Sequence, residues 1–279
     1  MRTSTTKNKQ SLPVVKPILR TPVSYYGGKQ TMLNEILPRI PKHRIYTEVF
    51  FGGGAVFWAK EPAEVEIIND LNREVINFYQ QLKSNYKELN MLIQQTLHSR
   101  TLHSDACFIY ERPHLFSAVM RAWAFYVGTQ QGFGTMIGSG WGYGNQDKIT
   151  SKIQNKKNNF LPVLQDRLQN TQIECNDAIK IINSRNFEDT FHYIDPPYVD
   201  VSQGHYEGYL RSDFELLLKT LEGIKGKFLL STYPTDILED YTNKNGWYTA
   251  RIDKPLGVAK VVDGKRKRKV EVLTANYPI

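Results

Sequence analysis

The chain has 279 residues, which is enough for one large domain or for a domain that carries a substantial insertion. Hydrophobic residues make up 41% and charged residues 23%, proportions that argue against a disordered or collagen-like chain. The two cysteines, Cys107 and Cys175, are too few for a disulfide scaffold, and no apolar run approaches the ~18 residues of a membrane-spanning helix. Because no apolar signal region stands at the N-terminus, a reducing cytoplasmic setting is expected.

The net charge of +8 is concentrated in three zones. Residues 1–20 carry +5 with no acidic residue, the run Lys265–Lys269 carries another +5, and residues 76–164 have nine Lys or Arg against four Asp or Glu. The remainder of the chain is therefore mildly acidic. Basic zones on an acidic body suit a polyanionic partner, although the alternative for a basic tail is a solvated arm.

The chain begins with a polar, basic segment and then switches to alternating strands and helices. Residues 1–16 show no periodicity and are expected to form a flexible arm. A β-rich run over residues 45–50 enters the turn Gly52-Gly53-Gly54, and apolar residues recur at helical spacing over residues 71–82. Strand, glycine turn, helix, strand and helix in this order are typical of a parallel α/β sheet. The first helix is expected at residues 55–60 and the second strand at residues 65–68.

The α/β pattern is interrupted in the middle of the chain. From about residue 77 to residue 160 the sequence predicts helices, together with a glycine-rich stretch from Gly128 to Gly144. We therefore expect one α/β domain built from residues 17–75 and 165–279, with residues 76–164 as an insertion. The other expected elements are helices at 115–127, 178–182 and 213–221 and strands at 172–175, 191–194 and 227–231.

The glycine turn and Asp70 favour a nucleoside site. Three glycines between a strand and a helix let the backbone turn tightly and bring a ligand close to the helix N-terminus. A dinucleotide fingerprint would need a glycine where Phe57 stands, which argues against a nicotinamide dinucleotide. Asp70 closes the second strand, where a carboxylate can accept hydrogen bonds from both ribose hydroxyls. The alternative is that Asp70 caps a helix starting at Leu71.

The motif Asp195-Pro196-Pro197-Tyr198 directly follows an expected strand. Two prolines cannot continue a strand or a helix, so they fix an acid, backbone carbonyls and an aromatic ring at the carboxyl end of a sheet. Acceptors from Asp195 and Pro196 can draw the hydrogens of a conjugated exocyclic amine out of the ring plane, which frees the nitrogen lone pair for attack. Tyr198 can stack on the same base once it is flipped out of the duplex. An ordinary rigid turn is the alternative interpretation.

Together these motifs resemble the Dam-like DNA adenine-N6 methyltransferases, which use S-adenosylmethionine. The resemblance covers most of the chain and includes the motif order: cofactor motifs first, then the target-recognition insertion, then the catalytic motif. It departs from the usual pattern at Val49, where proline is common, and at Gly53, where alanine is common. The matching segments are Tyr25-Tyr26-Gly27-Gly28-Lys29, Glu48 to Gly54, Asn69-Asp70-Leu71-Asn72, Cys175-Asn176-Asp177, Asp195 to Tyr198 and Lys267 to Leu273.

The resemblance implies a Rossmann-like methyltransferase sheet with an inserted, mainly helical DNA-recognition domain. S-adenosylmethionine is the implied methyl donor, and transfer from a sulfonium is an in-line displacement on an electrophile that is already activated. Positioning and lone-pair exposure then supply most of what is needed, so no metal is expected. The implied catalytic residues are Asp195, Pro196, Pro197 and Tyr198, and the implied cofactor-binding residues are Tyr25, Lys29, Phe51, Gly52, Asp70, Asp177 and Asp195.

Double-stranded DNA is the implied substrate, and its target sequence is expected to be read within residues 76–164, above all in the stretch 130–148. This stretch is rich in glycine, amide and aromatic side chains that can enter a groove, whereas the alternative is a flexible connector. Trp123 and Tyr126, in contrast, are expected in the core. The basic run is expected to contact phosphates. The expected DNA-binding residues are Gln130, Gln131, Trp141, Tyr143, Lys265, Arg266, Lys267 and Arg268.

The sequence leaves other functions open. One alternative is methyl transfer to cytosine N4, to RNA or to a protein amide through a similar proline-rich motif, and another is a DNA-binding protein that has lost turnover. The pattern from Gly132 to Tyr143 differs from that of GATC-reading members of the family, so no GATC target is inferred. The spacing of His98, His103, Cys107 and His114 fits no usual set of metal ligands. A monomer without membrane association is expected.

Overall fold

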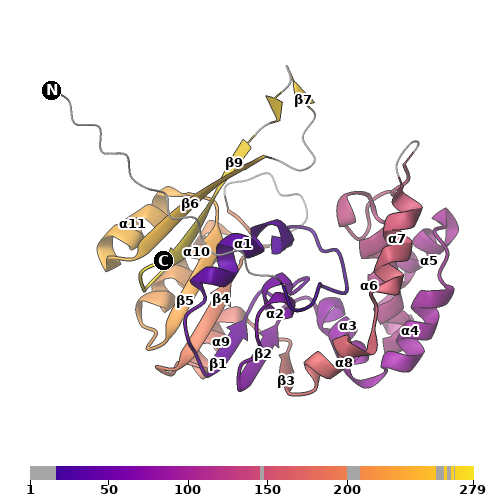
Figure 1. The fold of residues 1–279 in the computed structure, drawn as a ribbon, viewed down its shortest axis with the longest axis horizontal. Helices are drawn as coiled ribbons and strands as arrows, with labels where there is room; N and C mark the ends of the chain where they lie inside the picture. Colours follow the sequence, from indigo (N-terminus) through magenta and orange to yellow (C-terminus); the bar gives the residue numbers. More distant parts are fainter. Residues whose placement is uncertain (1–16, 145–147, 200–207, 256–260, 263–264, 267) are drawn as a thin grey trace.

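The computed structural model describes residues 17–144, 148–199, 208–255, 261–262, 265–266 and 268–279. Its centre is a seven-stranded sheet in the order β3-β2-β1-β4-β5-β9-β6, in which β1 to β5 are parallel and β9 is antiparallel to both neighbours. The α/β fold expected from the sequence is therefore confirmed (Figure 1). The strands are β1 Ile45–Glu48, β2 Val65–Asn69, β3 Thr171–Glu174, β4 Thr190–Ile194, β5 Lys227–Thr232, β6 Tyr248–Pro255 and β9 Arg268–Ala275.

Helices cover both faces of this sheet. Alternate residues of each strand point to opposite faces, so Tyr46 joins the hydrophobic cluster on one face while Ile45 joins the cluster on the other. The first face is covered by α1 (Leu33–Ile36), α2 (Ala55–Ala59) and α3 (Arg73–Ser84), and the second by α9 (Ala178–Ser184), α10 (Arg211–Glu222) and α11 (Asp236–Asn245).

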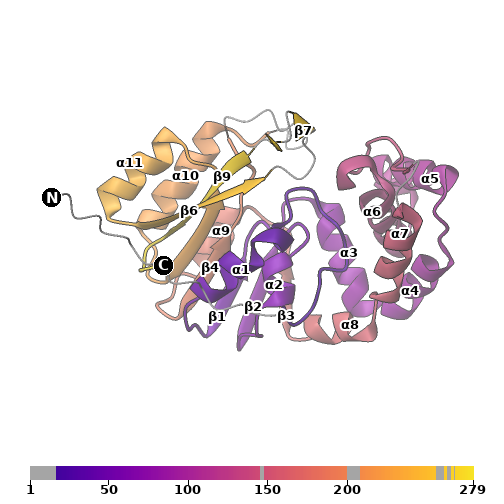
Figure 2. The ribbon, with the colours of Figure 1, turned by 45° about the horizontal axis from the view of Figure 1, so that its top comes forward.

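The helical segment in the middle of the chain gathers at one end of the molecule, as Figures 1 and 2 show. Its hydrophobic residues continue the cluster of the first sheet face, because Phe78 of α3 contacts Phe125 with ring centroids 5.4 Å apart. The sequence-based boundary at residue 76 thus falls inside α3. The remaining helices are α4 (Tyr86–Gln95), α5 (Arg100–Glu111), α6 (Ala118–Gln131), α7 (Ile149–Asn158) and α8 (Pro162–Leu168).

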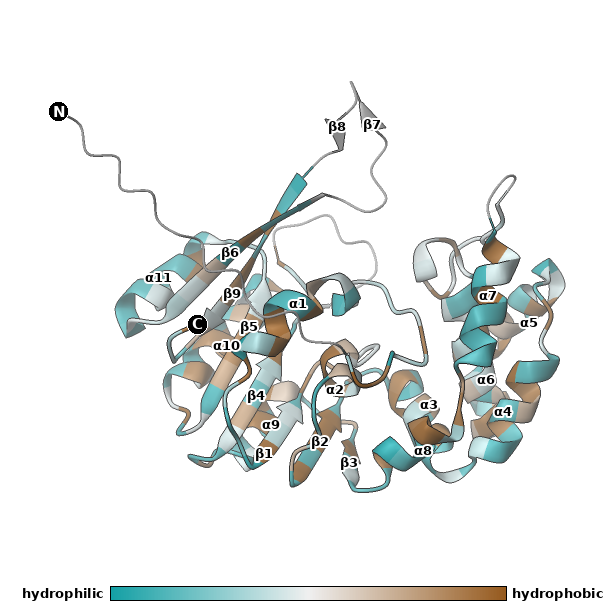
Figure 3. Ribbon diagram, viewed as in Figure 1, coloured by the Kyte–Doolittle hydropathy of each residue, from teal (hydrophilic) through white to brown (hydrophobic). Residues whose placement is uncertain are grey.

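Helix α6 forms the centre of this segment. It is almost entirely buried, and Trp123 and Tyr126 are core residues as predicted, with exposed fractions of 7% and 2%. Helix α7, in contrast, is hydrophilic over most of its length (Figure 3). No helix in the described part of the chain is both long and apolar enough to cross a membrane.

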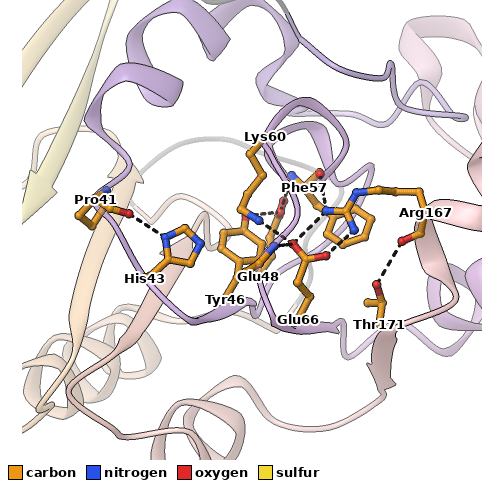
Figure 4. Close-up of polar contacts among 10 residues, drawn as sticks. Pro41, His43, Tyr46, Glu48, Phe57, Lys60, Glu66, Arg167 and Thr171 are labelled. Atoms are coloured by element: carbon orange, nitrogen blue, oxygen red, sulfur yellow. Dashed lines mark hydrogen bonds and ion pairs between the residues drawn. The ribbon is translucent and has the colours of Figure 1, made fainter.

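A buried charge cluster fastens the end of the insertion to the sheet (Figure 4). Glu66 of β2 accepts a hydrogen bond from Lys60 at 2.5 Å, and Arg167 of α8 binds both of its carboxylate oxygens. Arg167 also donates to the Phe57 carbonyl at 3.1 Å. Because one carboxylate holds two buried cations, removing Glu66 would leave both Lys60 and Arg167 without their anion.

Candidate active site

The predicted catalytic and cofactor-binding residues lie at the carboxyl edge of the parallel strands. The chain adds β2 and β3 on one side of β1 and then β4 and β5 on the other, so the strand order reverses between β1 and β4. Open α/β sheets bind ligands in the crevice outside such a reversal. The glycine loop follows β1, Asp70 follows β2, and Asp195 follows β4.

The glycine loop is shaped to meet two aromatic rings. Gly52 and Gly54 have φ values of +46° and +64°, a left-handed conformation that side chains disfavour. A Cβ at Gly52 would lie 2.8 Å from the Tyr25 ring, and one at Gly54 would lie 2.4 Å from the Phe51 ring. Phe51 is buried edge-on against Tyr79. The structure thus brings Tyr25, Phe51 and Gly52 together around the glycine loop.

The Asp70 carboxylate is fixed by two backbone N–H groups, and Asp70 is not the N-cap of the helix that follows it. Its two carboxylate oxygens accept from Gly52 N at 2.8 Å and from Asn72 N at 2.9 Å. Helix α3 begins at Arg73, and its N-cap is Asn72, whose side chain accepts from Glu74 N. The structure therefore does not bear out the alternative interpretation, in which Asp70 caps a helix starting at Leu71. Burial raises the pKa of Asp70 against these backbone bonds, and each oxygen keeps a lone pair for a further donor.

Lys29 and Asp195, which lie far apart in the sequence, form a buried ion pair. Lys29 Nζ lies 2.7 Å from Asp195 Oδ1, and the two side chains are only 6% and 18% exposed. The ammonium also donates to the Gly27 carbonyl at 3.1 Å and lies 4.9 Å from the centre of the Tyr198 ring. Burial raises the pKa of Asp195 although Lys29 opposes the shift. The pair holds the Asp195 carboxylate in one position.

Asp177, the last predicted cofactor residue, lies at the same edge on a more exposed element. It is the N-cap of α9, and its side chain accepts from Lys180 N at 3.1 Å. The preceding residue, Asn176, exchanges two hydrogen bonds of 2.9 Å with Asn69 at the end of β2. These bonds fix the start of α9 beside the strand end that carries Asp70.

Glu48 is a buried site residue to which the sequence analysis gave no role. Its Oε2 accepts from the Tyr46 hydroxyl at 2.7 Å and from Phe57 N at 3.0 Å. Burial raises the pKa of Glu48 to about 8. Only its place in the segment Glu48 to Gly54 pointed to Glu48, because nothing in the sequence shows that a glutamate in a strand is buried. The bond to Phe57 ties β1 to the helix that follows the glycine loop.

The glycine-rich segment of the insertion is shorter than predicted. Helix α6 continues through Gly128, where the absence of a side chain allows Ile137 to pack, so the predicted loop position of Gln130 and Gln131 is wrong. Gln131 is 2% exposed and donates to the Leu97 carbonyl at 2.8 Å. Its amide group is thus occupied within the fold. Gln130, which is half-buried, accepts from the Ser24 hydroxyl at 3.3 Å.

Trp141 and Tyr143 form an aromatic stack on the surface of the insertion. Their ring centroids lie 5.6 Å apart, and the Arg100 guanidinium lies 4.7 Å from the Trp141 ring. Tyr143 is 59% exposed. A bridge between Gly132 and Trp141 closes the loop that ends at the first of these rings, and Tyr143 follows two residues later. Two further amide residues of the stretch 130–148, Asn145 and Gln146, which we also expected to enter a groove, lie outside the described residues.

The basic run divides into two parts. Arg268 at the start of β9 pairs with Asp253 of β6 at 2.8 Å, and both are more than half exposed. Lys269 turns inward instead, and its Nζ donates to the Tyr233 hydroxyl at 2.8 Å. The prediction for Lys267, and for the side chains of Lys265 and Arg266, lies outside what the structure describes. Among the described residues, no three His, Cys, Asp or Glu side chains are grouped to hold a metal ion.

The sheet order and the strand-end residues define a Rossmann-like α/β fold with its site at the strand reversal. The family model of the D12 class N6 adenine-specific DNA methyltransferases matches residues 25–252. This match extends over most of the chain, and the chain belongs to that family.

Individual relatives match shorter parts. The type II methyltransferase M1.LlaDCHI of Lactococcus lactis subsp. cremoris is 40% identical over 29% of this chain and 28% of its own length. The modification methylase StsI of Streptococcus sanguinis is 22% identical over 72% of this chain, but over only 32% of its own length. The chain therefore spans about a third or less of these relatives. A solved S-adenosylmethionine-dependent methyltransferase from Agrobacterium tumefaciens is 13% identical over 88% of this chain and 59% of its own, with a TM-score of 0.40.

Proposed function

We propose that the protein transfers a methyl group from S-adenosylmethionine to the N6 amino group of adenine in double-stranded DNA. The observation that carries this proposal is the Lys29–Asp195 pair at 2.7 Å beside Tyr198, at the point where the strand order reverses. Asp195, the prolines and Tyr198 supply acceptors and a stacking face from one rigid segment. Membership of the adenine-specific family supports adenine over cytosine as the base.

The residues around the glycine loop fit a nucleoside-bearing methyl donor. Asp70 is held by two backbone amides and keeps acceptor capacity for ribose hydroxyls. Gly52 brings the backbone against the Tyr25 ring in a place where a side chain would clash. We assign Tyr25, Lys29, Phe51, Gly52, Asp70 and Asp177 to this donor site. When bound, S-adenosylmethionine supplies a methyl group on a sulfonium that needs no Lewis acid for activation.

Asp195 and the Pro196 carbonyl act on the amine. Acceptors aimed at its two hydrogens pull them from the plane of the base, and the nitrogen lone pair then becomes available for an in-line displacement. In that displacement the N–C bond forms, the S–C bond of the sulfonium breaks to leave a neutral thioether, and the methylated nitrogen loses one proton. The ion pair with Lys29 favours the charged, accepting form of Asp195 against the effect of burial. Tyr198 holds the plane of the flipped base.

The helical insertion serves as the DNA-recognition part in this proposal. Its exposed stack of Trp141 and Tyr143, with Arg100 beside it, can meet bases or a groove. Gln130 is kept as a contact candidate, whereas Gln131 holds the end of α6 to the start of α5. We propose that Lys265, Arg266, Lys267 and Arg268 contact phosphates and that one copy of the chain acts on the DNA.

One experiment separates this function from its alternatives. The purified protein is incubated with labelled S-adenosylmethionine and double-stranded DNA, RNA or a protein extract, and the nucleosides are then resolved. The proposal expects label in N6-methyladenine from DNA, and none with Asp195→Ala. Label in N4-methylcytosine, in RNA or in protein would contradict it, and DNA binding without label would indicate an inactive relative.

A further inference from the structure

Tyr233 lies beside the catalytic motif although no sequence motif marks it. It directly follows the last residue of β5, and β5 runs parallel to β4, which carries Asp195 at its end. The ring centroids of Tyr233 and Tyr198 are 4.3 Å apart, and their planes are inclined by 59°. A second half-buried aromatic ring therefore lies beside Tyr198, the residue assigned to stack on the base.

The hydroxyl of Tyr233 is held by an ion pair between a half-buried lysine and a buried glutamate. Lys269 Nζ donates to it at 2.8 Å and lies 3.0 Å from Glu271 Oε1. Glu271 is only 3% exposed, and its Oε2 makes no hydrogen bond. The antiparallel register brings β9 residues to the same edge, because Val272 pairs with Thr232 at the end of β5.

Glu271 separates two lysines that the sheet pairing brings together. The pairing of β6 with β9 sets Lys254 directly opposite Lys269, and like charges in such positions repel. Glu271 lies between them, 3.8 Å from Lys254 Nζ. Burial works to raise the pKa of Glu271, but Lys29, Lys254 and Lys269 outweigh it, so that its pKa is lowered.

We propose that Tyr233 is a second base-binding residue, and that Glu271 and Lys269 are positioning residues that fix its ring next to Tyr198. This inference rests on the proposed function, because the ligand is the flipped adenine. Stacking on a base requires a ring held at a fixed inclination, and a hydrogen bond from Lys269 to the hydroxyl restrains the far end of the Tyr233 ring. Lys269 therefore differs in role from its exposed neighbour Arg268.

The test compares Tyr233→Ala, Tyr233→Phe, Lys269→Gln and the double variant Tyr233→Phe/Lys269→Gln. Mapping of methylated adenines with the wild type first gives the target sequence, and a duplex with 2-aminopurine at the target position reports stacking of the flipped base through its fluorescence. Methyl transfer is measured in single turnovers and S-adenosylmethionine affinity by calorimetry. Tyr248→Ala is the matched control, because this exposed tyrosine pairs with Ala275 at the opposite end of the sheet.

Tyr233→Ala should slow methyl transfer by about 5- to 100-fold, with a brighter 2-aminopurine signal and unchanged cofactor affinity. Tyr233→Phe and Lys269→Gln should each cost roughly threefold to tenfold, and the double variant should cost no more than either one, because both remove the same contact. The control should match the wild type.

Three results would overturn the inference in distinguishable ways. An unchanged transfer rate in Tyr233→Ala would remove Tyr233 from the base pocket. Additive losses in the double variant would show that Lys269 acts elsewhere, for instance on a phosphate. A wild type that methylates no adenine would contradict the proposed function itself and the inference with it.

Discussion

The sheet edge and the helical insertion hold their functional side chains in opposite ways. At the edge, Asp195 is locked by a buried lysine and Asp70 by two backbone amides. On the insertion, Trp141 and Tyr143 stack on the surface, and the Tyr143 side chain is 59% exposed. A reaction on an amine needs hydrogen-bond acceptors that are fixed before the substrate binds. The side chains of a surface loop that contacts DNA can instead be replaced without disturbing the hydrophobic core. The difference suits a division between methyl transfer and target choice.

The largest effect is expected at the sheet edge. Asp195→Ala should lower methylation on the order of 100-fold or more, because a group that acts on the reacting amine is lost. The variant also leaves Lys29 buried without its partner, which destabilises the fold. Asp195→Ala/Lys29→Met should recover thermal stability and stay inactive. Near-normal methylation by either variant, measured with labelled methyl donor, would break the catalytic assignment.

A smaller loss is expected for the donor site. Asp70→Ala should weaken S-adenosylmethionine binding about tenfold, since it removes an acceptor for the ribose and frees Gly52 N. Calorimetry on the cofactor measures this, with Asp236→Ala as a control at an exposed carboxylate on α11. An affinity equal to that of the wild type would return Asp70 to a purely structural role.

The basic run should contribute to DNA affinity equally for all DNA sequences. Replacing Lys265 and Arg268 with Ala should weaken binding to all DNA alike and reduce the salt slope of log K by about 1 per lost phosphate contact. Binding titrations at several salt concentrations, on target and unrelated duplexes, decide the matter. A changed target preference would instead assign base readout to the basic run.

The smallest effect on activity is expected from Glu48, although its effect on stability depends on pH. Its pKa is about 8 in the folded protein against an ordinary 4.5, so the unfolded chain releases this proton first as pH rises. The free energy of unfolding should therefore fall by on the order of a few kcal/mol between pH 5 and 8. Glu48→Gln should flatten this dependence in urea unfolding. An unchanged pH profile would show that Glu48 is ionised.

The sequence predicted the sheet edge better than the insertion, for physical reasons. The sheet-edge residues each follow directly after the strand that positions them: the glycine loop after β1, Asp70 after β2 and Asp195 after β4. Prediction of the strands from the sequence therefore suffices to place these residues at one edge of the sheet. Gln131 was misplaced because the helix runs through Gly128, where packing of Ile137 outweighs the low helix propensity of glycine. Tyr233 and Lys269 meet only through the antiparallel pairing of β5 with β9, which local pattern does not reveal.

The most direct test of the division between the two regions is a map of methylated adenines. DNA is exposed to the wild type, to a variant in which residues 132–144 are replaced by a loop of equal length without aromatic residues, and to Asp195→Ala. The account predicts N6-methyladenine at a defined sequence with the wild type, a relaxed or altered sequence with the loop variant, and none with Asp195→Ala. An identical methylated sequence from the wild type and the loop variant would contradict it.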